Sequence, residues 1–177
     1  GGGFVRSDPS QPFPNLQLYF SPVSYTKTPL SERKLMNPDP FSAFLLSHNP
    51  CRPSSRGHLE LASSDPQTYP VIHPNYLATQ NDIDDVLAGN RLLRQLVQTR
   101  PLADIITEEL IPGAGVEGDE ALLADFRARA DTVYHPTSTC KMGPASDALA
   151  VVDAQLRVHG LEGLRVVDAS IMPTVTG

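Results

Sequence analysis

The sequence has no tryptophan, only two cysteines and no cluster of basic residues. Its 14 Lys and Arg residues are scattered and outnumbered by 20 acidic residues, which gives a net charge of -6. Because a surface that binds nucleic acid needs clustered positive charge, this balance argues against nucleic acid as a partner. Two cysteines do not make a disulfide framework, and we expect Cys51 and Cys140 to be free thiols.

Long apolar runs are also missing. None approaches the ~18 residues of a transmembrane helix, so we expect no membrane-spanning segment. No basic stretch followed by an apolar one marks a signal peptide at the start, and we expect a cytoplasmic protein. The first residue is not Met, and Gly177 closes the chain directly after a pattern typical of a strand and turn. We therefore expect that both ends are truncated.

What is present is typical of a globular domain, since 40% of the residues are apolar and 19% are charged. Alternation with a period of two predicts strands at 15–25, 41–47 and 57–63. Helical spacing predicts helices at 79–97, 101–110 and 119–130. We expect short strands at 151–152, 156–158 and 164–167, and loops at 1–14, 49–56 and 64–78. This order indicates an α+β domain with a mixed, mostly antiparallel sheet packed with helices.

Residues 113–118, GAGVEG, fit the pattern G-x-G-x-x-G of dinucleotide-binding loops. That pattern requires a strand before it and a helix after it, so that bare N–H groups face a pyrophosphate. Here the preceding segment is predicted as helix and ends at Pro112, and the neighbouring acidic residues would repel a phosphate. We interpret the segment as a connection between helices. For the same reason we reject the hypothesis of a nicotinamide-dependent dehydrogenase that uses these residues.

Histidine is the next residue type that could carry chemistry. His48, His58 and His73 lie in predicted strands or loops without a partner at ligand spacing. No histidine pair fits a zinc-binding helix and no C-x-x-C motif occurs, so we expect no metal site. His135 differs because Pro136 follows it and biases its backbone toward extended geometry. Its imidazole suits proton transfer near neutral pH, although, taken alone, a loop histidine more often has a structural role.

The last candidate is the end of the strand predicted at 164–167. This strand delivers Asp168 and then the small residues Ala169 and Ser170. In α/β sheets this end of a strand is where cofactors bind, and small side chains let the backbone approach a ligand closely. A strand that ends in an Asp-stabilised turn is the alternative interpretation.

Taken together, these motifs resemble one family. The segments HPTSTCKMG (135–143), VDAQLRVHG (152–160) and LRVVDASIMP (164–173) are similar to the C-terminal signature of the glucose-methanol-choline (GMC) oxidoreductases. Earlier stretches, among them RPSSRG at 52–57 and PNYL at 74–77, resemble the substrate domain of the choline dehydrogenase-like and alcohol dehydrogenase branch. The resemblance covers nearly the whole chain, with several spaced motifs in order.

The resemblance implies that residues 1–177 form the substrate-binding and C-terminal domain of an FAD-dependent alcohol oxidoreductase, with 131–177 contributing flavin-side contacts. It implies that the enzyme removes the hydroxyl proton of a small-molecule alcohol and passes a hydride to flavin N5. By position, His135 matches the catalytic histidine, as a general base or as a hydrogen-bond partner of the alkoxide. Asp168 and Ala169 match the strand end that meets the FAD, and Tyr134 is expected beside the flavin.

The sequence also departs from the family pattern. The family's N-terminal FAD-binding portion has no counterpart here, and neither does the turn beyond Gly177 that carries a second catalytic residue. We therefore expect the remainder of the polypeptide to hold most of the FAD, and the 177-residue segment alone to be inactive. A non-catalytic binding or interaction module that retains the fold is the competing hypothesis.

Overall fold

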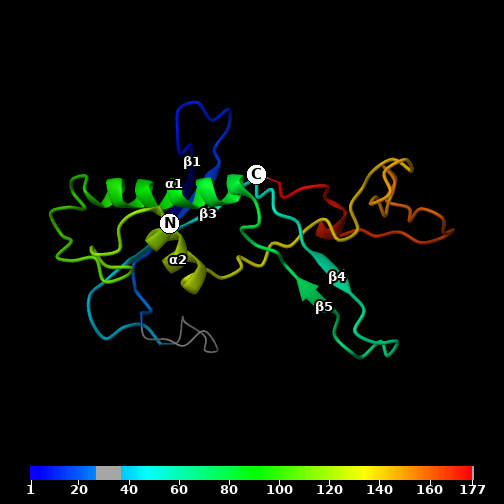
Figure 1. The fold of residues 1–177 in the computed structure, drawn as a ribbon, viewed down its shortest axis with the longest axis horizontal. Coiled ribbons are helices and arrows are strands. Elements are labelled where there is room, and N and C mark those ends of the chain that lie inside the picture. The colour runs from blue at the N-terminus through cyan, green and yellow to red at the C-terminus, as the bar shows by residue number, and fades with distance from the viewer. Residues whose placement is uncertain (27–36, 177) are drawn as a thin grey trace. The chain divides into compact units, whose positions relative to one another are not determined.

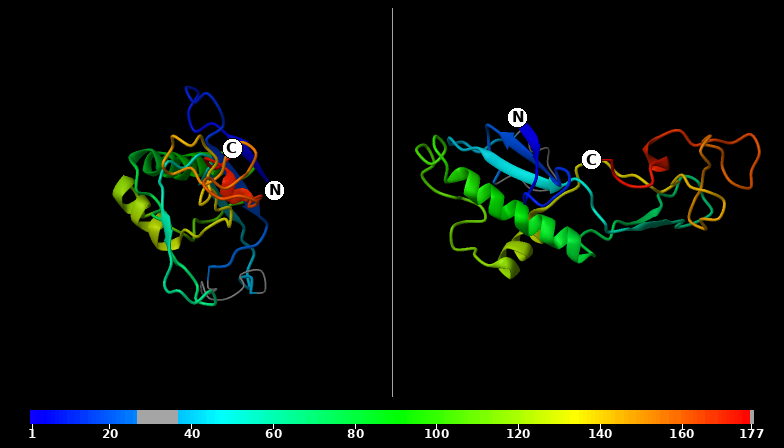
Figure 2. Two further views of the ribbon diagram at one scale, coloured as in Figure 1. Left: turned by 90° about the vertical axis from the view of Figure 1, so that its right-hand side faces the viewer. Right: turned by 90° about the horizontal axis from the view of Figure 1, so that it is seen from above.

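The computed structural model describes residues 1–26 and 37–176. In chain order its elements are β1 (Gly2–Val5), β2 (Leu16–Ser21), β3 (Leu45–Pro50), β4 (His58–Glu60), β5 (Val71–His73), α1 (Gln80–Val97), α2 (Asp119–Arg129) and the short 3-10 helix η2 (Ala169–Ile171) (Figures 1 and 2). The strands form two antiparallel sheets, β1-β2-β3 and β4-β5. The predicted α+β class, with antiparallel pairing dominant, is confirmed.

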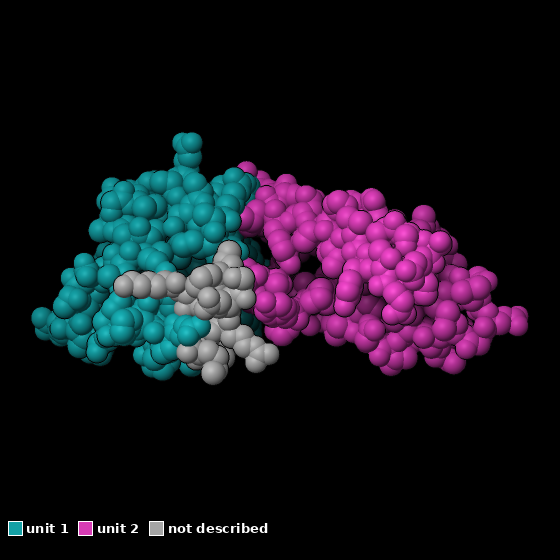
Figure 3. All heavy atoms as spheres, turned by 90° about the horizontal axis from the view of Figure 1, so that it is seen from below, with its two compact units in different colours: residues 1–50, 83–130 teal, residues 51–82, 131–177 magenta. Residues whose placement is uncertain are grey.

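The chain divides into two compact units (Figure 3). The first comprises residues 1–50 and 83–130, and the second comprises residues 51–82 and 131–177. No helix in the described ranges is both long and apolar enough to cross a membrane. Cys51 and Cys140 are both thiols outside any disulfide, as expected.

The first unit is a three-stranded sheet with helix α1 running along it (Figures 1 and 2). Apolar residues at helical spacing place Val86 and Leu87 in its core, together with Leu16 of β2 and Leu122 of α2. The helix is joined to the sheet by a contact of 3.0 Å between His48 Nε2 of β3 and Asn90 Oδ1. The predicted helices at 79–97 and 119–130 are therefore confirmed, and each has a buried face that explains it.

Gly89 is the residue of α1 that lets the His48 ring lie against the helix, because a Cβ at this position would overlap the ring atoms. In an ordinary helix interior, Gly→Ala stabilises by about 1 kcal/mol. Here Gly89→Ala should instead lower the free energy of unfolding by about 2 kcal/mol, the typical cost of overpacking. Urea unfolding followed by circular dichroism measures this change.

The matched control for Gly89→Ala is the same substitution in a His48→Ala background. With the ring removed, the added methyl has space, and Gly89→Ala should become neutral or stabilising. An equal cost in both backgrounds would show that the His48 contact does not limit this position.

The second unit holds the β4–β5 hairpin, the start of α1 and the C-terminal segment. Thr79 Oγ1 accepts from Asp82 N at 3.4 Å, the first half of the capping box that the Thr79–Asp82 spacing predicts. The Asp82 carboxylate instead accepts from Ser54 N at 2.7 Å, Ser54 Oγ at 2.9 Å and Ser55 N at 3.0 Å. Asp82 is 2% exposed, so this carboxylate ties the start of the helix to the loop before β4.

Burial of the Asp82 carboxyl opposes its ionisation, but hydrogen bonds from Ser55 and Ser54 outweigh burial. They hold the pKa of Asp82 well below its ordinary value. The group is therefore an ionised, fully partnered carboxylate, and its role is to stabilise the fold.

Strand β1 is a correction, because residues 1–14 were predicted as loop. Glycines are rare in strands, so Gly2 and Gly3 hid this element. The strand forms by antiparallel pairing with β2. Gly2 permits this close backbone approach, because a Cβ at its position would overlap the Leu18 carbonyl.

The strand predicted at 41–47 is wrong in its position, because β3 runs Leu45–Pro50. Its register pairs Leu16 with Pro50. Phe44 lies before the strand and contacts Phe20, with the two ring centroids 5.6 Å apart. Pro50 is tolerated because β3 is an edge strand. The predicted loop at 64–78 likewise contains β5, which the register with β4 creates.

The helix predicted at 101–110 is also wrong. Only isolated helical turns form there, such as Ile106 N to Leu102 O at 3.1 Å. Arg94 instead binds this segment and the residues that follow it. Its guanidinium donates to Glu109 Oε1 at 2.9 Å and to the carbonyls of Val116 and Gly113 at 2.8 and 3.2 Å. Residues 113–118 therefore form part of the connection between α1 and α2, and the element directly before them is the helix α1, not a strand.

The strands predicted at 151–152, 156–158 and 164–167 are reduced to isolated bridges. Positive φ angles explain this, since Leu156, Gly160 and Gly163 lie at 66°, 76° and 73°. Each is a left-handed turn residue that ends an extended stretch after a few positions. The segment is held by turns and bridges around Val152, which is fully buried.

Candidate active site

The C-terminal segment of the second unit is built around residues 140–143 and 151–152. Val151 N donates to Lys141 O at 2.9 Å, and Gly143 N donates to Val152 O at 3.0 Å. A Cβ at Gly143 would lie 2.9 Å from the Ala150 Cβ, so the close approach requires glycine. These bonds fix the chain directly after the HPTSTC stretch that contains His135.

The same stretch is bonded to the turn at the end of the third motif. Cys140 N donates to Ser170 O at 3.0 Å, and Met142 N donates to Ile171 O at 2.8 Å. Residues 140–142 and 170–171 therefore lie side by side, although residues 143–169 separate them in the chain. The structure brings together the two segments that the sequence singled out separately for proton transfer and for cofactor contact.

His135 and Tyr134 are exposed on this segment. Tyr134 has φ 60° and is 77% exposed, and its backbone N–H donates to Thr132 Oγ1 at 3.1 Å. The left-handed residue turns the chain immediately before His135, and Pro136 restricts it immediately after. The imidazole is therefore presented to the surface of this segment and is not packed into a core. Its position relative to a flavin stays a prediction.

Three of the other histidines make a polar contact with a side chain or carbonyl of the fold, and His73 stacks on His58. His48 is 9% exposed, and burial lowers its pKa, which the hydrogen bond with Asn90 opposes. His159 Nε2 lies 3.0 Å from Gly143 O, and His58 Nε2 lies 2.9 Å from Glu60 Oε1. His48 is thus held neutral inside the first unit and is unsuited to exchange a proton with a substrate.

Asp168 has a local role that the sequence offered only as an alternative. Its Oδ1 accepts from Ser170 N at 2.8 Å and also from Ser170 Oγ, which caps the 3-10 helix η2. These two hydrogen bonds, the side-chain one being the larger, lower the pKa of Asp168. The carboxylate is ionised and committed to the turn. The predicted Asp-stabilised turn is therefore present, and cofactor contact by Asp168 itself stays a prediction.

The turn still offers a backbone surface to a ligand. Ile171 N donates to Asp168 O and Met172 N to Ala169 O, both at 3.2 Å, so these N–H groups are engaged inside it. Ala169 itself is exposed and carries the smallest side chain after glycine. A ligand could therefore approach the backbone at Ala169 without meeting a bulky side chain.

A hollow of about 470 Å³ in the second unit was not predicted. It is lined by Arg52, Pro53, Ser54, Arg56 and residues 174–176. The guanidinium group of Arg56 donates to the carbonyls of Pro53 and Ser55, both at 2.9 Å, and so helps to shape this hollow. The sequence signal was the RPSSRG stretch, but nothing local indicated that it would meet the end of the described chain.

Sequence reasoning also missed a cluster on the β4–β5 hairpin. His58, Glu60 and His73 offer ligand atoms that lie within 4.8 Å of one another. The period of two puts His58 and Glu60 on one face of their strand. The partner strand and its register had to be known before His73 could be added.

Comparisons with known proteins agree with the resemblance. The family model described as "GMC oxidoreductase" matches residues 53–177. The chain is 44% identical over 177 residues to "Choline dehydrogenase, mitochondrial" of Mus musculus, covering 98% of this chain and 28% of that protein. Its structure is similar to pyridoxine 4-oxidase from Mesorbium loti, with a TM-score of 0.82, 31% identity and coverage of 99% of this chain and 33% of that one.

A second solved structure carries the cofactor in its name. An FAD-dependent oxidoreductase from Chaetomium thermophilum has a TM-score of 0.69 and 27% identity, covering 76% of this chain and 23% of that one. The chain thus spans about a third or less of the length of each of these relatives.

Proposed function

The chain belongs to the GMC oxidoreductase family, and from that membership we propose that the protein containing it oxidises a small alcohol with FAD as the hydride acceptor. The observation that carries the proposal is the pair of backbone bonds from residues 140 and 142 to residues 170 and 171. These bonds hold the segment that follows the exposed His135 against the turn that contains the exposed Ala169. A proton acceptor and a cofactor contact must lie close together for this chemistry, and these two segments supply candidates for both.

The proposed substrate class is choline and related amino alcohols. The support is the 44% identity to a choline dehydrogenase over nearly all of this chain. Similarity to a pyridoxine oxidase, whose named substrate is also an alcohol, supports the broader class of CH–OH donors.

The proposed role of His135 is to accept the hydroxyl proton or to hydrogen-bond the alkoxide that forms. Its ring is exposed, and the flanking Tyr134 and Pro136 limit its backbone, so the ring can be presented in a defined direction. A bound FAD would supply the acceptor for the hydride. Tyr134, which is also exposed, is proposed to pack beside the cofactor.

The residues present fit part of an FAD site. The exposed Ala169 backbone is proposed to contact the cofactor, while the Asp168 carboxylate, turned into the cap of η2, holds the shape of this turn. The carboxylate is satisfied by Ser170, so its charge is directed to the turn. We propose that residues 1–177 act as the substrate-binding and C-terminal domain, with 131–177 on the flavin side, and that other parts of the polypeptide hold most of the FAD.

Anaerobic mixing of the whole protein with choline tests the function. The absorbance of oxidised flavin should bleach in proportion to the choline added. Ethyltrimethylammonium, which keeps the cationic head of choline but lacks the hydroxyl group, is the matched control and should leave the spectrum unchanged. A protein that carries no flavin, or a flavin that no alcohol reduces, would support the non-catalytic module instead.

A further inference from the structure

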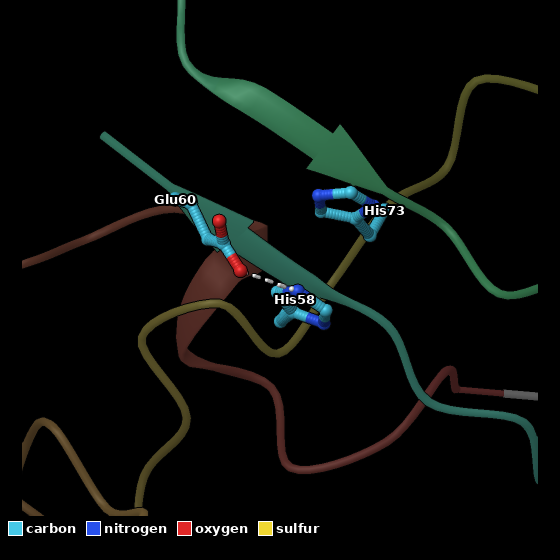
Figure 4. A group of neighbouring side chains, drawn as sticks. All are labelled: His58, Glu60 and His73. Atoms are coloured by element: carbon cyan, nitrogen blue, oxygen red, sulfur yellow. Dashed lines mark hydrogen bonds and ion pairs between the residues drawn. The ribbon is translucent and has the colours of Figure 1, made fainter. Parts of the chain in front are cut away.

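Three side chains that can bind a metal converge on one face of the β4–β5 hairpin (Figure 4). His58 and Glu60 come from β4 and His73 from β5. Their ligand atoms all lie within 4.8 Å of one another, and the two imidazole rings have centroids 4.5 Å apart. All three residues are exposed, so a hydrated ion can reach them.

The hairpin register is what brings the two histidines together. His58 stands directly opposite His73, and Glu60 is two positions further along β4 on the same face. Opposite residues of an antiparallel pair have Cβ atoms about 5 Å apart, which two imidazoles can span with one ion between them.

The base of the hairpin keeps this register in place. A Cβ at Gly57 would overlap the carbonyls of His73 and Pro74, so the two strands approach closely just before His58. At the same end of the hairpin, Asn75 Nδ2 donates to Arg56 O at 2.9 Å. Close backbone contact and a cross-strand hydrogen bond thus position the cluster before any ion binds.

We propose that His58, Glu60 and His73 form a binding site for a divalent transition-metal ion, with zinc as the ion it fits best. Two imidazoles and one carboxylate are donors that zinc accepts, whereas calcium and magnesium prefer oxygen alone. The carboxylate also supplies a negative charge, and the remaining coordination positions are open to water.

The separation of the donors is compatible with this ion. Zinc–nitrogen bonds of about 2.1 Å bring tetrahedral ligands to about 3.4 Å from one another. Ligand atoms at the 4.8 Å limit must therefore approach by up to about 1.4 Å, which rotations of exposed side chains provide. Glu60 already lies 2.9 Å from His58, so His73 has the largest movement to make.

Isothermal titration of the chelator-treated whole protein with zinc chloride tests the site. Wild type should bind one zinc ion, and His73→Ala should weaken that binding by at least about 10- to 100-fold, because loss of a ligand should cost no less than loss of an outer-shell partner. Glu60→Gln should also weaken binding, while Asp65→Asn, which removes an exposed carboxylate from the loop of the same hairpin, should leave it unchanged.

A variant that keeps or gains zinc affinity shows that weak binding by the other variants reflects a lost ligand and not a folding defect. Glu60→His replaces the carboxylate with a third imidazole at the same position and should retain or tighten zinc binding. The proposal is overturned if wild type takes up no zinc at millimolar concentration, or if wild type and His73→Ala bind it equally. None of these outcomes depends on flavin chemistry.

Discussion

Replacing His135 with alanine in the whole protein should slow reduction of the flavin by alcohol by about 10²–10⁴-fold, the usual contribution of a positioned acid–base group. The reason is structural as well as chemical. The segment that carries His135 is bonded through Cys140 and Met142 to the turn proposed to contact FAD. The imidazole is exposed there, so its removal leaves the turn intact. Stopped-flow measurement of anaerobic flavin reduction at saturating alcohol gives the rate.

The flavin content of His135→Ala should equal that of wild type, because the cofactor contacts proposed here belong to Tyr134, to Ala169 and to other parts of the polypeptide. A variant that lost its FAD would assign His135 to cofactor binding, and a variant with the wild-type rate of reduction would remove it from the mechanism. Both results would contradict the proposed role.

His135→Gln separates the two roles left open for this residue. A glutamine amide can hydrogen-bond an alkoxide but cannot accept the hydroxyl proton at neutral pH. If proton acceptance dominates, glutamine should be as slow as alanine. If hydrogen bonding dominates, glutamine should recover a large part of the rate.

Asp82→Ala should lower the free energy of unfolding by about 3 kcal/mol, the upper range for hydrogen bonds to a charged group. The carboxylate is 2% exposed and accepts from Ser54 N, Ser54 Oγ and Ser55 N. Its removal takes the acceptor from these donors, and the start of α1 keeps the bonds of Ala78 and Thr79 to the loop before β4. Chemical denaturation of the whole protein, followed by circular dichroism, measures the change.

The effect of Asp82→Ala should depend on pH in a defined direction. The pKa of Asp82 is lowered in the fold, so the carboxylate contributes its full stability above the unfolded value of about 3.9. That contribution is lost as pH falls through the lower folded pKa. Both the folded and the unfolded pKa of Asp82 lie below pH 5. The difference in unfolding free energy between wild type and variant should therefore be constant from pH 5 to 7 and should narrow in stronger acid.

Glu120→Gln is the matched control for Asp82→Ala, because it removes an exposed carboxylate from the first turn of the other helix, α2. It should cost only about 0.5 kcal/mol, the typical effect of a surface charge near a helix start. Equal costs for the two substitutions would show that the Ser54 and Ser55 contacts do not stabilise the protein.

The spacing of apolar residues predicted those helices and strands whose formation depends on neighbouring residues in the sequence. Helices α1 and α2 follow from apolar spacing, and β2 follows from alternation around Leu16 and Leu18. The helix predicted at 101–110 did not form, and the side chain of Arg94, seven positions before this segment, binds the carbonyls of Gly113 and Val116 that follow it. Strand β1 was hidden because its glycines are favoured only by the close approach of a partner strand.

By itself, the sequence determined the α+β class, the family motifs and the choice of His135 as the candidate proton acceptor, because those depend on residue type and order. Only the tertiary structure decided which distant segments meet. It joined residues 140–142 to 170–171, directed Asp82 to the Ser54–Ser55 loop and set His58 opposite His73. Strand register and long-range hydrogen bonds arise from packing between distant segments, and no short stretch of sequence contains them.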